Sequence, residues 1–320
     1  MTTENSSDAT VAVVVPCYNE ALTIGKVVAD FRAALPEADV YVFDNNSTDG
    51  TAGVAAEAGA TVVPAIRPGK GSVVRKMFSE VEADVYVMVD GDDTYESGKA
   101  RDMVDLLLAQ RLDMVVGTRQ PAAVDGDEFP AGHALGNKAF SGLFRLIFRS
   151  DEADAFSGYR VMSRRFVKSF PARTSGFDTE TELVAHAAEL RLEVAEVPVE
   201  YYARPEGSES KLGTYRDGAK ILWSAMRLFR DLRPKAFFGL LFALLTTVAV
   251  LLMVPVVIEY LDTGLVARFP TAILAASIEV VAVLLLASGL VISSVRQVSR
   301  EQRRLAYLAV EPVRGRTARP

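Results

Sequence analysis

The sequence predicts an α/β fold, with a mostly parallel sheet in its first half and membrane-spanning helices near its end. Short apolar runs rich in Val alternate with segments of helical periodicity over residues 11–116. This alternation is typical of parallel strands whose connecting helices cover both faces of a sheet. Two long apolar runs follow between residues 236 and 295. These observations together predict a globular α/β domain joined to a membrane anchor.

The expected strands are short apolar runs, each followed by a turn of polar residues. They cover residues 11–15, 40–43, 61–63, 85–89 and 112–116. The helices expected between them cover residues 21–35, 51–58, 72–81 and 100–110. Further along, the pattern predicts helices at 135–148 and 179–190 and strands at 158–162 and 192–202. In open sheets of this kind, ligands bind beyond the carboxyl ends of the strands.

The two long apolar runs have the length and composition of transmembrane helices. Residues 236–258 contain no charged side chain, and residues 272–295 contain only Glu279. A helix of this length matches the hydrocarbon core of a bilayer, which is roughly 30 Å thick. The alternative, a buried hairpin of core helices, would need a far larger protein around it. Arg and Lys residues flank the outer ends of both runs, so the positive-inside rule predicts that both long ends of the chain are cytoplasmic.

Residues 215–232 combine basic and apolar side chains at helical spacing. This pattern is typical of a helix on the membrane surface, although an ordinary amphipathic docking helix shares it. The first ten residues are polar and lack the basic region of a signal peptide. We therefore expect a disordered N-terminus (1–10), an α/β domain (11–212), an amphipathic juxtamembrane helix (213–235), a two-helix transmembrane hairpin (236–295) and a basic cytoplasmic tail (296–320).

Composition argues against several kinds of site. The formal net charge of −6 argues against nucleic acid as a partner. Only His133 and His186 are present, which leaves almost no material for a His-based zinc site or a Ser-His-Asp triad. The single cysteine, Cys17, excludes an internal disulfide and agrees with a reducing compartment. Because its sequence neighbours include no His, we interpret Cys17 as a small buried thiol rather than a nucleophile.

The most informative local motif is an acidic turn directly after the apolar run at 85–89. Asp90, Asp92 and Asp93 place three carboxylates within four residues at the carboxyl end of a predicted strand. Carboxylates this close repel one another unless a cation lies between them, and a hard divalent cation prefers oxygen ligands. A solvated acidic turn is the alternative interpretation, because Asp and Gly are ordinary turn residues.

Four motifs in a fixed order suggest a family. The first two strands end in PCYNE (16–20) and DNNSTDGT (44–51), and RPGKG (67–71) and the DGD turn (90–92) follow. In this order they resemble the family-2 glycosyltransferases with a GT-A fold, and among these the polyprenyl-phosphate sugar synthases similar to dolichol-phosphate-mannose synthase. The resemblance covers about residues 11–212, and the two-span tail extends it to bacterial membrane-anchored members.

The resemblance implies a site for a nucleotide-diphosphate sugar, linked to UDP or GDP. The residues implied to bind the donor nucleotide are Pro16, Tyr18, Glu20, Asp44, Asn46 and Gly91. Asp90 and Asp92 match the family's DXD motif, which holds Mg²⁺ or Mn²⁺ against the donor diphosphate. The family often has a second Asp where this chain has Asn45, so that contact is expected to differ.

The resemblance also implies a site for phosphates and for the acceptor. The basic residues expected there are Lys70, Arg119, Arg160, Arg204 and Lys211. A solvated surface charge is the alternative for a lone Arg or Lys. Asp154, in the sequence DAFSGYR, matches the position of the family's proposed catalytic base, and a loop-capping Asp is its alternative.

The chemistry of the acceptor changes what Asp154 has to do. A lipid monophosphate has a second pKa of about 6, so at neutral pH it is already mostly a dianionic nucleophile. Such an oxygen needs orientation more than deprotonation. We therefore expect Asp154 to position the acceptor or the metal, and to remove a proton only from the minority monoanion.

These observations predict an inverting transfer of one sugar to a polyprenyl phosphate, of the undecaprenyl or dolichyl type, for glycan or cell-envelope biosynthesis. Transfer to another lipid or to a polysaccharide is an alternative, although the Q-x-x-R-W element of processive synthases is missing before Trp223. An oxidoreductase would need G-x-G-x-x-G after the first strand, and residues 16–25 do not supply it. A non-catalytic nucleotide-sugar-binding membrane protein is the third possibility. By analogy with anchored relatives, a homo-oligomer is also possible.

Overall fold

The structure is a computed structural model, and it describes residues 9–121, 154, 157–172, 179–203, 226, 229–230 and 233–312. The chain divides into two compact units by its internal contacts. Unit 1 comprises residues 1–129, 150–210 and 302–320, and unit 2 comprises residues 130–149 and 211–301. The expected helix at 135–148 and most of the expected juxtamembrane helix at 213–235 lie outside the described residues.

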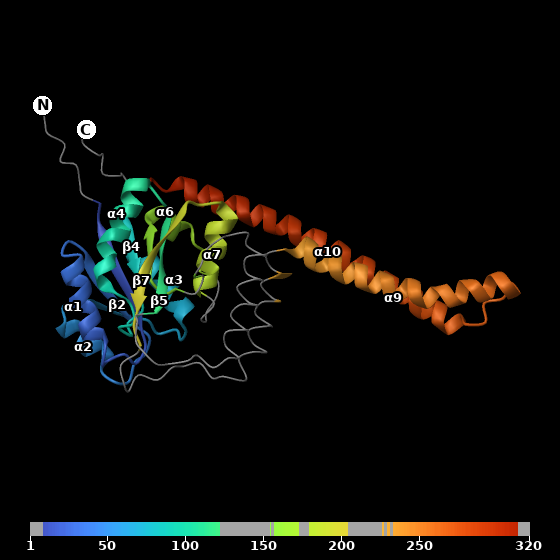
Figure 1. Cartoon of the computed structure of the whole chain (residues 1–320), viewed down its shortest axis with the longest axis horizontal. Helices are drawn as coiled ribbons and strands as arrows, with labels where there is room; N and C mark the ends of the chain where they lie inside the picture. The colour runs from blue at the N-terminus through green and yellow to red at the C-terminus, as the bar shows by residue number, and fades with distance from the viewer. Residues whose placement is uncertain are drawn as a thin grey trace, which may run out of the picture. The chain divides into compact units, whose positions relative to one another are not determined.

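Unit 1 is built on a seven-stranded sheet with the strand order β3-β2-β1-β4-β6-β5-β7 (Figure 1). The strands are β1 (Val11–Cys17), β2 (Asp39–Asp44), β3 (Thr61–Pro64), β4 (Val85–Met88), β5 (Met114–Pro121), β6 (Arg160–Ser163) and β7 (Val194–Tyr201). Only β6 runs antiparallel to its neighbours β4 and β5 among the described strand pairs. The predicted α/β fold with a mostly parallel sheet is therefore confirmed.

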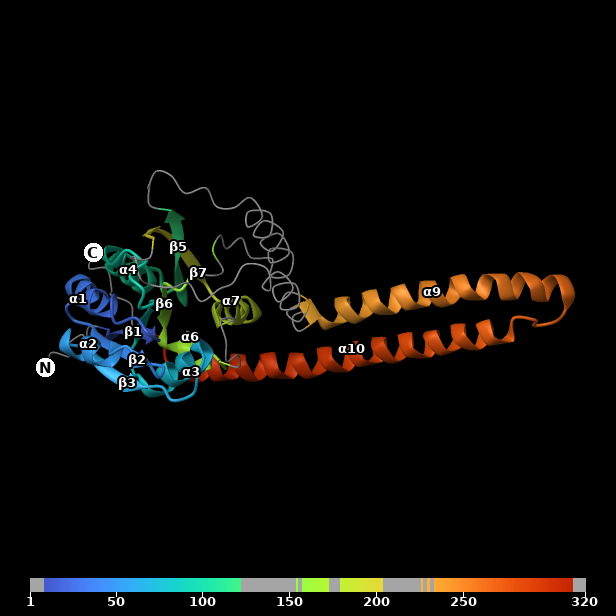
Figure 2. The ribbon, with the colours of Figure 1, turned by 90° about the horizontal axis from the view of Figure 1, so that it is seen from below.

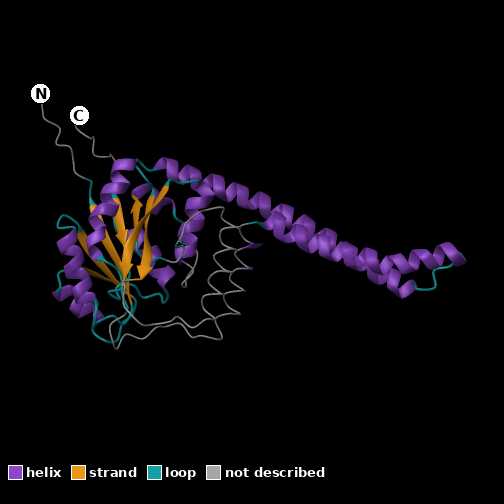
Figure 3. Cartoon of the chain, viewed as in Figure 1, coloured by secondary structure: helices purple, strands orange, loops and turns teal. Residues whose placement is uncertain are grey.

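Helices cover both faces of this sheet, as Figure 3 shows. The helices of unit 1 are α1 (Ile24–Ala34), α2 (Thr51–Glu57), α3 (Lys70–Glu80), the short 3₁₀ helix η1 (Ser97–Lys99), α4 (Ala100–Gln110), α6 (Arg164–Ser169) and α7 (Thr179–Leu190). Apolar residues of α1 and α4 pack on one face, and those of α3, α6 and α7 pack on the other. The sheet is therefore buried on both sides, which explains the continuous apolar composition of its central strands.

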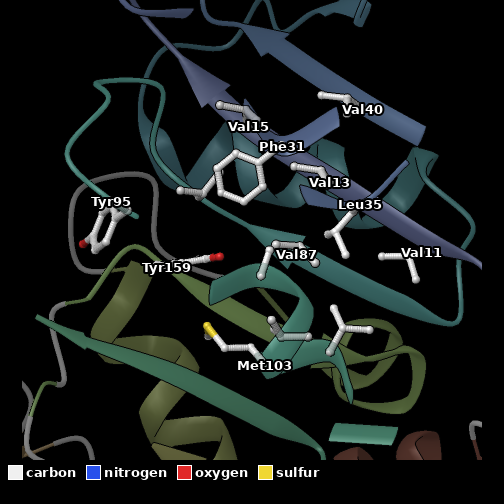
Figure 4. Close-up of a cluster of buried hydrophobic side chains, with 14 of the residues drawn as sticks. Val11, Val13, Val15, Phe31, Leu35, Val40, Val87, Tyr95, Met103 and Tyr159 are labelled. Atoms are coloured by element: carbon white, nitrogen blue, oxygen red, sulfur yellow. The ribbon is translucent and has the colours of Figure 1, made fainter. Parts of the chain in front are cut away.

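Strand β1 shows how the alternation of side chains builds two cores. Val11, Val13 and Val15 point to the core formed with α1 and α4, where Phe31 contacts Tyr159 edge to face (Figure 4). Ala12 and Val14 point to the opposite core, formed with α3, α6 and α7. Burying side chains of this size contributes about 1.5–3 kcal/mol each, so the central strands are a main source of stability.

Unit 2 contains two long helices, α9 (Pro234–Thr263) and α10 (Phe269–Ala309), which run side by side in Figures 1 and 2. Within the described part of the chain, these are the helices long and apolar enough to cross a membrane. Ala275, Ala282 and Gly289 are buried at intervals of seven residues, so small side chains line the contact between the two helices. The last residues of α10, from Gln302 onward, belong to unit 1. From the sequence we expected a basic cytoplasmic tail at residues 296–320.

Candidate active site

The carboxyl ends of three parallel strands bring the predicted site residues to one edge of the sheet. Cys17 at the end of β1 is in register with Asp44 at the end of β2, and β4 pairs with the other side of β1. Pro16 lies in β1, and Gly91 lies in the turn just after β4. This edge is where open α/β sheets bind their ligands.

Hydrogen bonds between two loops stiffen this edge. The backbone N–H of Asn19 donates to Ser47 Oγ at 2.9 Å, and the N–H of Thr48 donates to Asn19 Oδ1 at 2.9 Å. The N–H of Glu20 donates to Thr51 Oγ1, also at 2.9 Å. The turns after β1 and β2 are therefore held together as one rigid surface.

Asp44 offers an unused acceptor on this surface. Its Oδ2 accepts a hydrogen bond from the N–H of Ser47 at 3.3 Å, while its Oδ1 is buried and has no hydrogen-bond partner among the described residues. A buried oxygen without a donor is costly, so a ligand N–H or hydroxyl is the natural partner. At the same edge Tyr18, which follows the end of β1, is 46% exposed, and the Asn46 amide donates to the carbonyl of Ile66 at 2.9 Å.

Asn45, where the resemblance led us to expect a second Asp, holds the loop at 65–69. Its Nδ2 donates to the carbonyls of Ala65 and Arg67 at 2.6 and 2.8 Å. Its Oδ1 accepts from the N–H of Gly69 at 2.9 Å. A carboxylate could not donate to the two carbonyls, so in this chain the position serves the loop that leads into α3.

Lys70 connects the acidic turn to a residue that the sequence analysis missed. Its Nζ lies 2.5 Å from Asp90 Oδ1 and 2.5 Å from Glu180 Oε1. Burial lowers the pKa of Lys70, but the two carboxylates outweigh this effect and raise the pKa above its ordinary value. Lys70 is therefore a permanent cation between two acids at this edge of the sheet.

Glu180 lies in the first turn of α7 and is only 6% exposed. A buried acid is unusual unless it is paired, and Lys70 is the partner of this one. The sequence signal was weak, because acids are common in the first turn of any helix. Only the packing of α7 beside α3 brings Glu180 to Lys70, across 110 residues of chain.

The other members of the acidic turn have different surroundings. Asp92 is 4% exposed, and its Oδ1 accepts a hydrogen bond from Thr94 Oγ1 at 2.7 Å. The carbonyl of Gly91 accepts from Thr23 Oγ1 at 2.6 Å. Asp93 has a left-handed backbone with φ of 56°, and its carboxylate pairs with Lys26 at 2.7 Å. Asp93 therefore shapes the turn, whereas Asp90 and Asp92 bracket Gly91 at its centre.

Within the described ranges, no three His, Cys, Asp or Glu side chains converge as a complete set of metal ligands. Mg²⁺ and similar ions are commonly held by one or two carboxylates together with substrate phosphates. The hard oxygen donors of Asp90 and Asp92 fit that kind of site.

Two glycines allow close packing around the acidic turn. A Cβ on Gly158 would overlap Asp90 Oδ2, so the segment before β6 lies directly against that carboxylate. A Cβ on Gly91 would lie 2.5 Å from Cys17 Sγ. Burial and the neighbouring carboxylates, Glu20 foremost, raise the pKa of Cys17 well above its ordinary value, so the thiol stays neutral. The interpretation of Cys17 as a buried thiol fits this environment.

Asp154 and Arg119, two predicted site residues, are paired with each other. Arg119 Nε and Nη2 donate to the two oxygens of Asp154 at 2.7 and 2.8 Å, and the Arg119 N–H adds a contact at 3.2 Å. The guanidinium also lies 5.4 Å from the centre of the Tyr201 ring. This bidentate ion pair fixes the position of the Asp154 carboxylate.

Of the remaining basic residues, Arg160 lies inside the protein. It is 0% exposed, and its Nε donates to the carbonyl of Ser157 at 3.0 Å. In this structure Arg160 therefore supports the segment around Gly158 from within, and direct contact with a phosphate stays a prediction. Arg204 and Lys211 lie outside the described residues.

The comparisons with known proteins agree with this arrangement. Residues 12–170 match the glycosyl transferase family 2 domain. Glycosyltransferase AglJ of Haloferax volcanii is 36% identical over 234 residues, which cover 72% of this chain and 75% of AglJ. The chain belongs to glycosyl transferase family 2. The resemblance found in the sequence is thereby confirmed.

Two further comparisons concern this family-2 glycosyltransferase. A dolichyl-phosphate hexose transferase of Haloferax volcanii is 30% identical over 211 residues, which cover 66% of this chain and 90% of that relative. The crystal structure of glucosyl-3-phosphoglycerate synthase from Mycobacterium tuberculosis, in complex with Mn²⁺ and UDP-glucose, has a TM-score of 0.55. At 21% identity the likeness covers 69% of this chain and 78% of that structure. The predicted GT-A fold is confirmed.

Proposed function

We propose that this glycosyltransferase transfers one sugar, with inversion, from a nucleotide-diphosphate sugar to a polyprenyl phosphate. One observation carries the proposal: a family-2 domain shares its chain with two helices long and apolar enough to span a membrane. The similarity to a dolichyl-phosphate hexose transferase supports the choice of acceptor. The donor sugar is UDP- or GDP-linked, and the product serves glycan or cell-envelope biosynthesis.

In this proposal the nucleotide lies over the ends of β1 and β2. The unused Oδ1 of Asp44 accepts a hydrogen bond from the base or the ribose. Pro16, Tyr18 and Glu20 line the same edge, and Gly91 contributes its backbone to the donor site at the acidic turn. Asn46 contributes from the turn after β2, which its amide links to the carbonyl of Ile66 in the loop after β3.

The diphosphate lies at the acidic turn. Asp90 and Asp92 would hold Mg²⁺ or Mn²⁺ there, and the bound ion would neutralise charge that develops on the leaving nucleotide. Lys70 carries a permanent positive charge beside Asp90 and adds to that neutralisation. Glu180 holds Lys70 from the other side, so that the lysine stays beside the turn.

The acceptor phosphate approaches from the side of Asp154 and Arg119. Arg119 fixes Asp154 through two hydrogen bonds, and the pair presents both a cation and an acid to the incoming phosphate. We propose that Asp154 orients the acceptor rather than deprotonating it, because a phosphate dianion is already nucleophilic at neutral pH. Arg204 and Lys211 would add positive charge, and Arg160 would support the site from the interior.

A membrane anchor suits such an acceptor. Removing a polyprenyl chain from the bilayer costs about 0.8 kcal/mol per exposed CH₂ group, so the enzyme has to work where its substrate lies. The basic residues that flank the two helices favour a cytoplasmic face for the catalytic domain and for the C-terminus.

The test is an assay on membranes that contain the full chain. They are incubated with a panel of labelled UDP- and GDP-sugars and a polyprenyl phosphate, with and without Mg²⁺ or Mn²⁺. We expect one donor to give an acid-labile, organic-extractable sugar phosphate. The absence of such a product from every donor would refute the proposal, and donor binding without product would favour a non-catalytic binding protein.

A further inference from the structure

The carboxyl-terminal end of α10 contacts the last turn of α7 within unit 1. Arg303 forms an ion pair with Glu189, and the two side chains are only 14% and 10% exposed. The neighbouring Arg304 donates from Nη1 to the carbonyl of Leu190 at 3.3 Å. A nearly buried pair is costly to break, because either charge alone would be left without its partner.

The same segment also contacts the residue before β5 and the helix α6. The Tyr307 hydroxyl lies 3.0 Å from each carboxylate oxygen of Asp113, which also accepts from Ser163 Oγ at 3.1 Å. Arg165 donates from Nε to the carbonyl of Val310 at 2.7 Å, and its guanidinium lies 4.9 Å from the centre of the Tyr307 ring. The segment is therefore docked through several specific polar contacts.

The opposite end of α7 belongs to the candidate active site. Glu180, in the first turn, contacts Lys70, which also contacts Asp90. Helix α7 has 12 residues and is therefore about 18 Å long. Between its ends, Leu183 and Ala187 are buried in the core that α7 shares with α3 and α6. A helix packed in this way moves as a unit, so a constraint at one end acts on the other.

We infer that Arg303 and Tyr307 are positioning residues for the donor site. By holding the carboxyl end of α7, the docked end of α10 fixes the place of Glu180, and Glu180 in turn holds Lys70 beside Asp90. The inference rests on the proposed function for the identity of the ligand. It adds that the carboxyl-terminal end of α10 is required for donor binding.

The experiment compares two charge-neutralising substitutions on one helix in the full chain, in detergent or nanodiscs. Arg303→Gln removes the ion pair, whereas Arg300→Gln changes an exposed arginine three residues earlier. Hydrogen–deuterium exchange is measured along α7, and binding of UDP- and GDP-sugars with Mn²⁺ is measured by calorimetry without acceptor. We expect Arg303→Gln to raise exchange in the first half of α7 and to weaken donor binding at least about 5-fold. Arg300→Gln should match the wild type in both measurements.

Two further variants distinguish a loss of positioning from misfolding of the protein. The charge swap Glu189→Arg with Arg303→Glu should recover part of the lost donor affinity, and Tyr307→Phe should reproduce the effect more mildly. Faster exchange confined to the last turn of α7, or unchanged donor affinity in Arg303→Gln, would overturn the inference. If the wild type binds no donor, the proposed function fails, and the exchange pattern alone still decides whether the two ends of α7 are coupled.

Discussion

At the scale of single residues, the site depends on side chains that both donate and accept hydrogen bonds, so that a residue of similar shape cannot replace them. Asn45 is the clearest case, because its amide donates to two carbonyls and accepts from one N–H. Asn45→Asp turns a donor into an acceptor that faces two carbonyl oxygens. We expect a loss of about 1–3 kcal/mol in the free energy of unfolding, measured by urea denaturation. Asn46→Asp, at an exposed position, is the control and should cost less.

The contact between Gly91 and Cys17 can be tested with a pair of substitutions. Gly91→Ala places a methyl group 2.5 Å from Cys17 Sγ, and overpacking of this kind costs about 1–3 kcal/mol. Cys17→Ala removes the sulfur, so the double variant should be more stable than Gly91→Ala alone. Thermal unfolding of the three variants measures the coupling. Simple additivity of the two effects would show that the crowding is absent.

The role of Asp154 can be tested by the pH dependence of activity. If Asp154 positions the acceptor, Asp154→Asn should lower kcat/KM by about 100-fold at pH 6 and at pH 8 alike, since misplacement of the reacting groups has that scale of effect. If Asp154 is a base, the loss should appear at pH 6 and disappear at pH 8. At the higher pH the phosphate acceptor has already lost its second proton.

At the scale of whole elements, close packing of helices decides where glycine is required. In the pair formed by α9 and α10, a Cβ on Gly289 would lie 2.6 Å from Phe238 Cβ, whereas a Cβ on Gly239 would meet nothing within 4 Å. Small residues at such contacts let helices approach closely, which is how helices commonly associate in membranes.

This difference predicts opposite effects of the same substitution. Gly289→Ala should lower the melting temperature of the full chain in detergent, followed by the loss of its size-exclusion peak on heating. Gly239→Ala should leave it unchanged or raise it slightly, because Ala in a helix is more stable than Gly by about 0.5–1 kcal/mol. Equal behaviour of the two variants would contradict the observed helix contact.

At the scale of the whole molecule, a GT-A domain and two apolar helices belong to one chain. The exposed side chains of α9 and α10 are mostly large and apolar, for example Leu251 at 66% and Leu284 at 61%. Surfaces of this kind need a lipid or a protein cover. We expect the full chain to remain with the membrane pellet through high salt and alkaline carbonate, and to be released only by detergent. Release by carbonate would argue for peripheral attachment instead.

The helices, the strands and the edge at which the site residues gather could largely be predicted from the sequence. The spacing and length of apolar runs depend on the geometry of the helix or strand that they form. The Val-rich runs predicted the central strands, and the polar residues after 11–15, 40–43 and 85–89 predicted the edge at which the site residues gather. Parallel strands deliver their carboxyl ends to one edge whatever the details of packing. The length and composition of the runs at 236–258 and 272–295 similarly predicted the two long helices.

The tertiary structure alone decided which of these residues are partners. Glu180 reaches Lys70, Asp154 pairs with Arg119, and Arg160 turns into the core. The end of α10 docks on Asp113 and Glu189. The spacing of apolar residues indicates which side chains are neighbours along one helix or strand. These contacts instead depend on how α7, α10 and the segment before β6 pack against the rest of unit 1. The sequence by itself determined the sheet and the edge at which the candidate site residues gather, and only the packing of distant elements determined the charge pairs at that edge.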